Sequence, residues 1–242
     1  MDFSHFDIRN YPILKVREGY KEWVETYEAT VQDEMDLRLL SRLKTISWTH
    51  IEKTLDLACG TGRIGAWLKN KGVREIDGVD ITPEMLKSAK EKKIYRQLLT
   101  RDIRATQLDT NGYNLAIVVL ADEHIPDLVP LYKEAARITD SKGLFVIVGY
   151  HPYFLLNGLI THFHRPDGEA VGIESYIHLM KDHVKAAHSF GWMLTEMDEG
   201  IIDEEWIRKK PKWEKYLNRP VSFVMVWKKR LNQQRLKRKV SL

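Results

Sequence analysis

The chain has 242 residues, a formal net charge of +4 and one cysteine, Cys59. This length suits one large domain, or one domain with additions, that buries most of its apolar surface without disulfides. A single cysteine excludes an internal disulfide and is typical of a reducing compartment. The sequence holds no apolar run of about 18 residues and no apolar core near its start, so we expect no transmembrane helix and no signal peptide. These features predict a cytoplasmic protein without membrane contact.

Residues 1–46 precede the first expected strand and are predicted to be helical. Within residues 17–46, Tyr20, Trp23 and Tyr27 recur at helical spacing and share one face. Two interpretations of this aromatic face remain open. It either packs into the core or covers a ligand, in which case Tyr20 and Tyr27 line a substrate pocket.

A strand, a glycine turn and a helix are indicated next. The apolar run Thr54–Ala58 is interrupted only by Asp56, and Gly60-Thr61-Gly62 follows before an apolar-periodic helix begins. Glycines at such a turn tolerate positive φ, and the helix that follows points its N–H groups at the turn. A second expected strand, 76–80, ends in Asp80, where a carboxylate accepts hydrogen bonds from ribose hydroxyls. The pattern predicts a nucleoside-carrying cofactor.

Strands and helices then alternate along the chain. Further strands are expected at 95–100, 113–120 and 141–148, with helices starting at Pro83 and spanning 126–138. Such alternation implies a mostly parallel sheet with helices on both faces and ligands at the carboxyl ends of its strands. After a long loop, the pattern predicts a helix over 175–190 and two final strands, 194–202 and 221–227.

Two cofactors compete for the glycine turn. Residues 60–65 match GxGxxG, and Asp80 follows at the distance expected for NAD. The strand that leads into an NAD turn is usually purely apolar, however, whereas Asp56 lies inside this one. The arrangement Asp56-x-Ala58-x-Gly60-x-Gly62 resembles motif I of class I S-adenosylmethionine (SAM) methyltransferases. In that family the acid helps to hold the methionine end of SAM, and the glycines make room for the cofactor.

The resemblance continues in order over about residues 50–150. It implies that Asp80 binds the ribose, that Ile81 lies beneath the adenine and that Asp102 accepts a hydrogen bond from the adenine amino group. The neighbouring Ile103 and Leu120, at the end of the fourth strand, complete the predicted cofactor site. The implied fold is α/β and Rossmann-like: a seven-stranded, mostly parallel sheet with helices on both faces and an antiparallel last strand.

Other parts of the resemblance concern the acceptor. The loop 121–127 resembles the family's loop that opens onto the methyl group, and the N-terminal segment resembles a lid that folds over the cofactor. Ala58 stands where many members carry glycine. No NPPY-like sequence follows the fourth strand, which disfavours amino methylation of nucleic-acid bases.

Histidines supply the candidate catalytic residues. His151 begins the long loop 151–174, which we expect to form a cap, His162 lies within that cap, and His124 follows the fourth strand. A neutral imidazole in any of these places can accept a proton from the methyl acceptor, and His164 is expected in the substrate pocket. We expect no metal site, because one His-x-His pair supplies too few converging ligands.

The sequence therefore predicts a SAM-dependent methyltransferase that acts on a small-molecule acceptor. A lid segment, 1–46, precedes a SAM-binding domain, 47–230, and a basic, disordered tail, 231–242, follows it. The tail favours an RNA methyltransferase as the main rival function, although it lacks aromatic residues on which bases could stack. An NAD-dependent oxidoreductase is a second rival, and a SAM-fold protein without catalysis is a third. The acceptor atom and the oligomeric state do not follow from the sequence.

Overall fold

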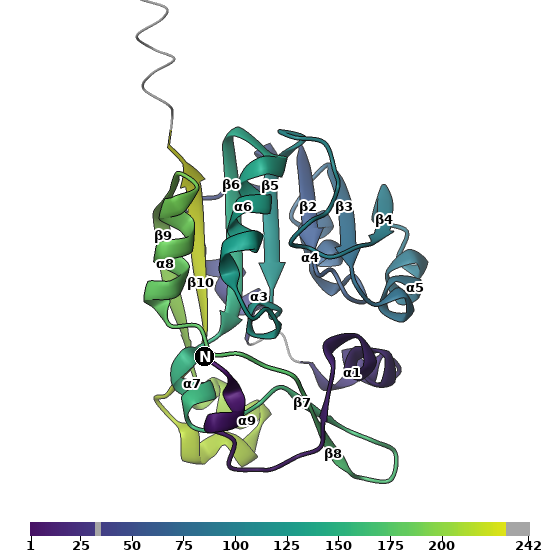
Figure 1. Cartoon of the computed structure of the whole chain (residues 1–242), viewed down its shortest axis with the longest axis vertical. Coiled ribbons are helices and arrows are strands. Elements are labelled where there is room, and N and C mark those ends of the chain that lie inside the picture. Colours follow the sequence, from purple (N-terminus) through teal and green to yellow (C-terminus); the bar gives the residue numbers. More distant parts are fainter. Residues whose placement is uncertain (32–34, 231–242) are drawn as a thin grey trace, which may run out of the picture.

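A seven-stranded sheet forms the centre of the protein, in a computed structural model that describes residues 1–31 and 35–230. The strand order is β4-β3-β2-β5-β6-β10-β9 (Figure 1). The strands are β2 (Lys53–Leu57), β3 (Glu75–Asp80), β4 (Gln97–Thr100), β5 (Tyr113–Val119), β6 (Thr139–Tyr150), β9 (Trp192–Ile201) and β10 (Pro220–Lys229). Strands β2 to β6 pair in parallel, whereas β10 is antiparallel to both β6 and β9. The predicted fold class is confirmed.

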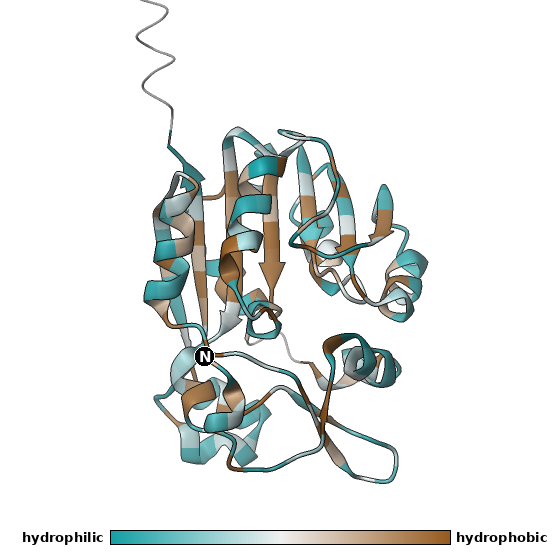
Figure 2. Ribbon diagram, in the orientation of Figure 1, coloured by the Kyte–Doolittle hydropathy of each residue, from teal (hydrophilic) through white to brown (hydrophobic). Residues whose placement is uncertain are grey.

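Helices cover both faces of this sheet because side chains alternate along its strands. Leu115 and Ile117 of β5 pack in one apolar cluster with α3 (Leu37–Arg42) and α4 (Arg63–Asn70). Ala116 and Val118 pack on the other face with α6 (Leu128–Ile138) and α8 (Met180–Ser189). A further helix, α5 (Pro83–Glu91), contacts β3 and β4. Figure 2 shows apolar residues concentrated on the central strands, as two buried faces require.

A second, smaller sheet lies beyond the carboxyl ends of the parallel strands (Figure 1). Its order is β1 (Ile13–Leu14), β8 (Ala170–Ile173) and β7 (His162–His164). The same end of the molecule holds α1 (Val16–Trp23), α7 (Pro152–Leu156) and α9 (Glu204–Lys209). The remaining elements are α2 (Tyr27–Thr30) and four short 3-10 helices, Phe3–His5, Trp48–His50, Asp122–His124 and Pro211–Tyr216.

The structure corrects several predicted boundaries. The helix expected over 175–190 starts only at Met180, because the preceding residues make tertiary contacts in an extended conformation: Tyr176 bridges to Asp2, and Nε2 of His178 lies 2.7 Å from the carbonyl oxygen of Ile125. The expected N-terminal helices are the three separate helices α1, α2 and α3. The predicted basic tail, 231–242, lies outside the described residues. Across 1–31 and 35–230, no helix is long and apolar enough to cross a membrane.

Candidate active site

The glycine turn after β2 adopts the backbone conformation that its sequence predicts. Ala58, Gly60 and Gly62 all have positive φ, at 59°, 52° and 84°. A Cβ added at Gly60 would meet no atom within 4 Å, so the turn borders open space there. A Cβ at Gly62 would instead approach Cε2 of Tyr95 to 2.9 Å. Gly60 therefore leaves room for a ligand, whereas Gly62 allows close packing at the start of α4.

A cavity of about 460 Å³, here called the first cavity, opens beside this turn. Its volume lies within the range of small-molecule sites. Its wall includes ten of the residues that the sequence predicted for the site: Tyr20, Tyr27, Ala58, Gly60, Asp80, Ile81, Asp102, Ile103, Leu120 and His124. The ends of four parallel strands bring most of these residues together, as the doubly wound topology requires.

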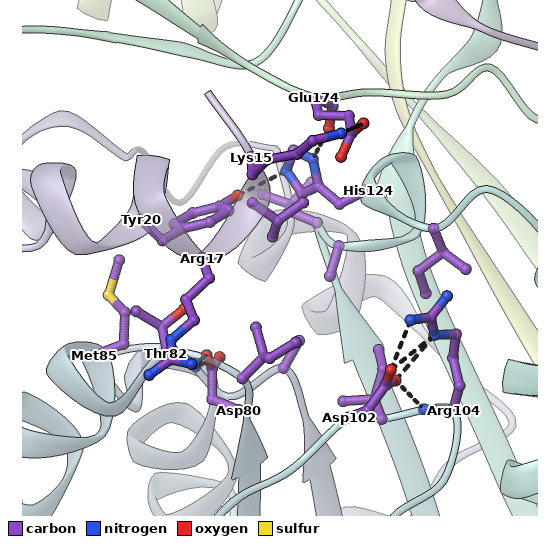
Figure 3. Close-up of a pocket in the computed structure, with 18 of the residues that line it drawn as sticks. Lys15, Arg17, Tyr20, Asp80, Thr82, Met85, Asp102, Arg104, His124 and Glu174 are labelled. Atoms are coloured by element: carbon purple, nitrogen blue, oxygen red, sulfur yellow. Dashed lines mark hydrogen bonds and ion pairs between the residues drawn. The ribbon is translucent and has the colours of Figure 1, made fainter. Parts of the chain in front are cut away.

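Sequence reasoning missed other residues of the first cavity. Lys15 and Arg17 reach it from the start of α1, and Glu174 enters after β8. Figure 3 shows Arg17 extending across the cavity toward Asp80 and Thr82. Nζ of Lys15 lies 2.5 Å from Oε1 of Glu174, an ion pair that joins the N-terminal segment to the cap. The sequence signals for these residues were the resemblance of the segment next to Lys15 and Arg17 to a lid, and the place of Glu174 at the end of the expected cap, 151–174.

Asp80 ties the glycine turn to the end of β3. Its Oδ2 accepts a hydrogen bond from the backbone N–H of Gly60, and its Oδ1 accepts one from that of Thr82, both at 2.8 Å. Burial raises the pKa of Asp80, and the hydrogen bonds from these backbone N–H groups oppose that shift. Each oxygen can accept a second hydrogen bond, and the carboxylate lines the first cavity.

Asp102 lines the first cavity with a carboxylate that Arg104 already binds (Figure 3). The backbone N–H of Arg104 donates to Oδ1 at 2.8 Å, and Nη2 donates to Oδ2 at 2.6 Å. The hydrogen bond from the guanidinium lowers the pKa of Asp102. An adenine amino group would therefore compete with Arg104 for this carboxylate.

Asp56 is not among the residues that line the first cavity. Its side chain is buried, and Oδ2 accepts a hydrogen bond from the Tyr95 hydroxyl at 2.7 Å. Burial raises the pKa of Asp56 to about 7. Its predicted contact with the methionine end of SAM remains a prediction, whereas its contact with Tyr95 supports the packing behind the turn.

His124 and Tyr20 form a polar pair on the wall of the first cavity (Figure 3). Nδ1 of His124 lies 2.7 Å from the carbonyl oxygen of Glu174, and Nε2 lies 2.9 Å from the Tyr20 hydroxyl. A carbonyl oxygen only accepts, so Nδ1 carries a proton, and in the neutral imidazole Nε2 accepts from the Tyr20 hydroxyl. Burial raises the pKa of Tyr20 well above its usual range, which keeps the phenol neutral. His124 can act as a base only when Tyr20 releases Nε2.

Glu123 is a functional candidate that the sequence analysis did not single out. Its Oε1 accepts from the Thr161 hydroxyl at 3.2 Å, and the buried Oε2 has no hydrogen-bond partner. Burial raises the pKa of Glu123 to about 7, although His124 beside it opposes the shift. The only signal was its place in the loop 121–127. A carboxyl with one unoccupied oxygen is suited to receive a proton.

Glu123 lines a further cavity of about 920 Å³, here called the second cavity. The two cavities share Tyr20, Tyr27 and Leu120. Leu120 has a φ of 52°, a strained conformation for a branched side chain that is characteristic of ligand sites. These three residues therefore lie between the two cavities.

The structure separates the three predicted cap histidines from the first cavity. His151 borders neither cavity; its Nε2 lies 3.0 Å from Oε1 of Glu199, and its Nδ1 accepts from the backbone N–H of Tyr153 as a cap of α7. His162 and His164 line the second cavity. Nδ1 of His162 lies 2.9 Å from the carbonyl oxygen of Ile160, and Nε2 lies 3.3 Å from Nη1 of Arg9. Both nitrogens of His151 and of His162 are therefore engaged.

No group of three His, Cys, Asp or Glu side chains is arranged to hold a metal ion within the described ranges. In the first cavity, Asp80, Asp102 and His124 instead bind other side chains or the backbone.

Comparison with known proteins identifies the domain. Residues 55–147 match the family model of a methyltransferase domain. The chain is similar to a malonyl-[acyl-carrier protein] O-methyltransferase of Hamiltonella defensa, with 29% identity over 59% of this chain and 55% of that protein. It is also similar to a demethylmenaquinone methyltransferase of Thermotoga maritima, with 28% identity over 42% of this chain and 44% of that protein. The matches span about half the length of these curated relatives.

The fold is shared with a solved complex of DhpI with S-adenosylhomocysteine (SAH), at a TM-score of 0.63 and 16% identity over 87% of this chain and 93% of that one. The predicted resemblance to class I methyltransferases is thus confirmed, and the neighbour DhpI was solved with SAH bound. The residues of the first cavity fit such a ligand. Gly60 leaves open space beside the turn, and the Asp80 carboxylate can accept further hydrogen bonds at the end of β3.

Proposed function

We propose that this chain is a class I SAM-dependent methyltransferase and that it transfers the methyl group of SAM to a small-molecule acceptor. The observation that carries the proposal is that two neighbouring cavities share the lining residues Tyr20, Tyr27 and Leu120. One cavity is bordered by the glycine turn and the strand ends, and the other by the cap. Bound SAM supplies a methyl group on a sulfonium, which is a good leaving group.

The residues of the first cavity would hold the cofactor. Asp80 accepts hydrogen bonds from ribose hydroxyls while its carboxylate keeps the Gly60 turn in place. Ile81 and Ile103 provide apolar surface for the base. The rings of Tyr20 and Tyr27 lie where a sulfonium would be attracted to their faces. Positioning of the two reactants accounts for most of the rate, up to ~7–11 kcal/mol in ideal cases.

Glu123 is the group that we propose to receive a proton from an acceptor that carries one. Glu123 follows β5 and lines the second cavity, as Tyr20 does, and its buried Oε2 has no hydrogen-bond partner. His124 is the alternative base that the sequence predicted, but Tyr20 occupies its accepting nitrogen. A correctly placed base contributes roughly 10²–10⁴-fold to the rate.

The relatives support an acceptor outside nucleic acid. One is named for malonyl-[acyl-carrier protein] and another for demethylmenaquinone. An RNA acceptor remains the alternative that the basic residues 231–242 raise. A gel-shift titration with mixed RNA, using the whole chain and a chain that ends at Arg230, distinguishes the two. The predicted cytoplasmic location, and the division into a lid, 1–46, and a catalytic domain, 47–230, stay part of this proposal.

Native mass spectrometry of freshly purified protein tests the cofactor, followed by calorimetry with SAM, SAH and NAD. We expect a co-purified mass of SAM or SAH and micromolar or tighter binding of both. Tight NAD binding without SAM binding would refute the proposal. Turnover of SAM to SAH with an acceptor identified from a co-purified mass separates an enzyme from a protein that only binds SAM.

A further inference from the structure

We propose that the second cavity takes a methyl acceptor with a flat apolar body and an anionic group, the anion bound near Lys212 and Lys215 and the methylated group beside Glu123. This inference rests on the proposed function, because it assigns the acceptor of the same reaction. Three features of the second cavity carry it: its aromatic walls, the charge on its lining and the position of its one carboxylate.

Two stacked aromatic pairs line the second cavity. Trp23 and Phe163 stack with ring centroids 5.6 Å apart and planes 14° apart. Phe154 and Trp213 stack with centroids 5.4 Å apart and planes within 7°. One pair joins α1 to the cap, and the other joins the cap to the 3-10 helix Pro211–Tyr216. Flat ring surfaces of this kind favour a ligand with a planar apolar body.

Positive charge gathers where the 3-10 helix Pro211–Tyr216 borders this cavity. Lys212 and Lys215 line the cavity and are exposed, and neither forms an ion pair with a described residue; Nζ of Lys215 lies 5.0 Å from the ring centroid of Tyr216. Arg9 adds a guanidinium whose Nη1 contacts Nε2 of His162. Cations that border an apolar cleft attract and orient an anionic ligand.

The second cavity has one carboxylate among its described lining residues, that of Glu123. Glu123 is 1% exposed and is bonded to Thr161, whereas the lysines are open to solvent. Glu123 is next in sequence to His124, which lines the first cavity. It lines the second cavity together with Tyr20, one of the three residues that the two cavities share. An anion would be repelled by Glu123 and attracted by the lysines. An anionic acceptor is thereby oriented with its uncharged, methylated end toward the cofactor.

In the proposed orientation, every bond, electron pair and proton of the methyl transfer is accounted for. A lone pair of the acceptor heteroatom forms the bond to the methyl carbon as the carbon–sulfur bond of SAM breaks. Sulfur retains the electron pair of that bond and leaves as the neutral thioether of SAH. The proton of the acceptor passes to the unpartnered Oε2 of Glu123.

Calorimetry with three probes tests the inference on the full chain saturated with SAH. The probes are 2-naphthoate, 2-naphthyl phosphate and the neutral 2-naphthamide, which share one flat body. We expect at least one anion to bind about tenfold or more tightly than the amide at low salt, and this preference to shrink as salt is added. The two anions distinguish a carboxylate acceptor from a phosphate acceptor.

Reversing the charges of Lys212 and Lys215 tests whether these two residues cause the preference for the anionic probes. Lys212→Glu with Lys215→Glu should abolish the preference for the anion and leave the amide affinity within about twofold, because the flat body still meets the same rings. Lys142→Glu with Lys181→Glu makes the same change of charge at exposed positions that border neither cavity, and should keep the preference. If the first pair of substitutions impairs SAH binding, Lys212→Gln with Lys215→Gln replaces it.

The outcomes separate this inference from the proposed function. A wild-type chain that binds no SAH refutes the proposed function. A chain that binds SAH but binds neither anion more tightly than the amide refutes only the inference. Equal loss of the preference in both pairs of variants also refutes it, because the anion would then respond to net charge and not to Lys212 and Lys215.

Discussion

Replacement of Asp80 by Asn tests the centre of the proposed cofactor site with almost no change in side-chain volume. Each carboxylate oxygen of Asp80 accepts one backbone N–H at 2.8 Å, from Gly60 and from Thr82. The Asn amide has a single acceptor oxygen, so one of these two N–H groups must face an NH₂ group. The side chain is 7% exposed, so water can replace little of what is lost.

The size of the effect follows from these contacts. A hydrogen bond to a charged group contributes about 1.5–3 kcal/mol to stability. Burial raises the pKa of Asp80, which means that the buried charge is itself costly, so removing it recovers part of this loss. We therefore expect Asp80→Asn to lower the free energy of unfolding by about 1.5 kcal/mol, or roughly 3–6 °C in Tm. Loss of a ribose contact should weaken SAH binding about tenfold or more.

Calorimetry with SAH and thermal denaturation measure the two effects separately. Asp109→Asn is the matched control, because Asp109 is exposed and borders neither cavity. The control should change neither the Kd nor the Tm. A folded Asp80→Asn protein whose Kd for SAH stays within about twofold of the wild-type value would remove Asp80 from the cofactor site and refute this reasoning.

Three further predictions follow from the same contacts. Burial raises the pKa of Glu123 to about 7, so turnover should rise between about pH 6 and 8, and Glu123→Gln should lower it about 10²-fold or more and flatten the rise. Glu123→Gln should also be more stable than wild type at pH 8 but not at pH 5, because a carboxyl with a raised pKa in the folded state reduces the stability of the fold as it ionises. A pH–rate profile measures the effect on turnover, and urea denaturation measures the effect on stability. Unchanged turnover in Glu123→Gln contradicts the role of Glu123 as the base. Tyr95→Phe should lower the free energy of unfolding by ~1–3 kcal/mol at pH 8 and by less at pH 5, where Asp56 is protonated, and equal losses in urea at both pH values would count against this account. Deletion of residues 231–242 should leave SAH affinity and small-molecule turnover unchanged, because the described residues that line the two cavities lie between Arg9 and Tyr216. A loss of turnover at low salt would favour the RNA alternative.

The large sheet was predictable because its strands are short apolar runs that alternate with helical periodicity. Both faces of β5 are buried, and its sequence from Tyr113 to Val119 is accordingly an almost continuous apolar run. The start of α8 was not predictable. Residues 175–179 have helix-compatible side chains, but Tyr176 and His178 bond to residues far away in sequence. Such contacts override local preference and leave no local signal.

The grouping of the predicted cofactor residues around the first cavity was predictable for a topological reason. Asp80, Asp102 and Leu120 follow different strands, and parallel pairing brings all three strand ends to one edge of the sheet. The place of a residue directly after a strand did not predict whether it lines the proposed methyl-acceptor cavity. His151 follows β6 directly, but its ring caps α7 and faces Glu199, a residue of β9.

The sequence by itself determined which backbone positions could approach a cofactor, because glycine turns and strand–helix periodicity are local properties of the chain. Only the tertiary structure decided which side chains keep an unoccupied hydrogen-bonding atom at a cavity. The Tyr20 hydroxyl is hydrogen-bonded to Nε2 of His124, 104 residues away in sequence, and Lys15 forms an ion pair with Glu174, 159 residues away. Oε2 of Glu123, in contrast, has no hydrogen-bond partner. Chemical capacity depends on which partners a polar group already has, and those partners are set by distant parts of the chain that meet only on folding.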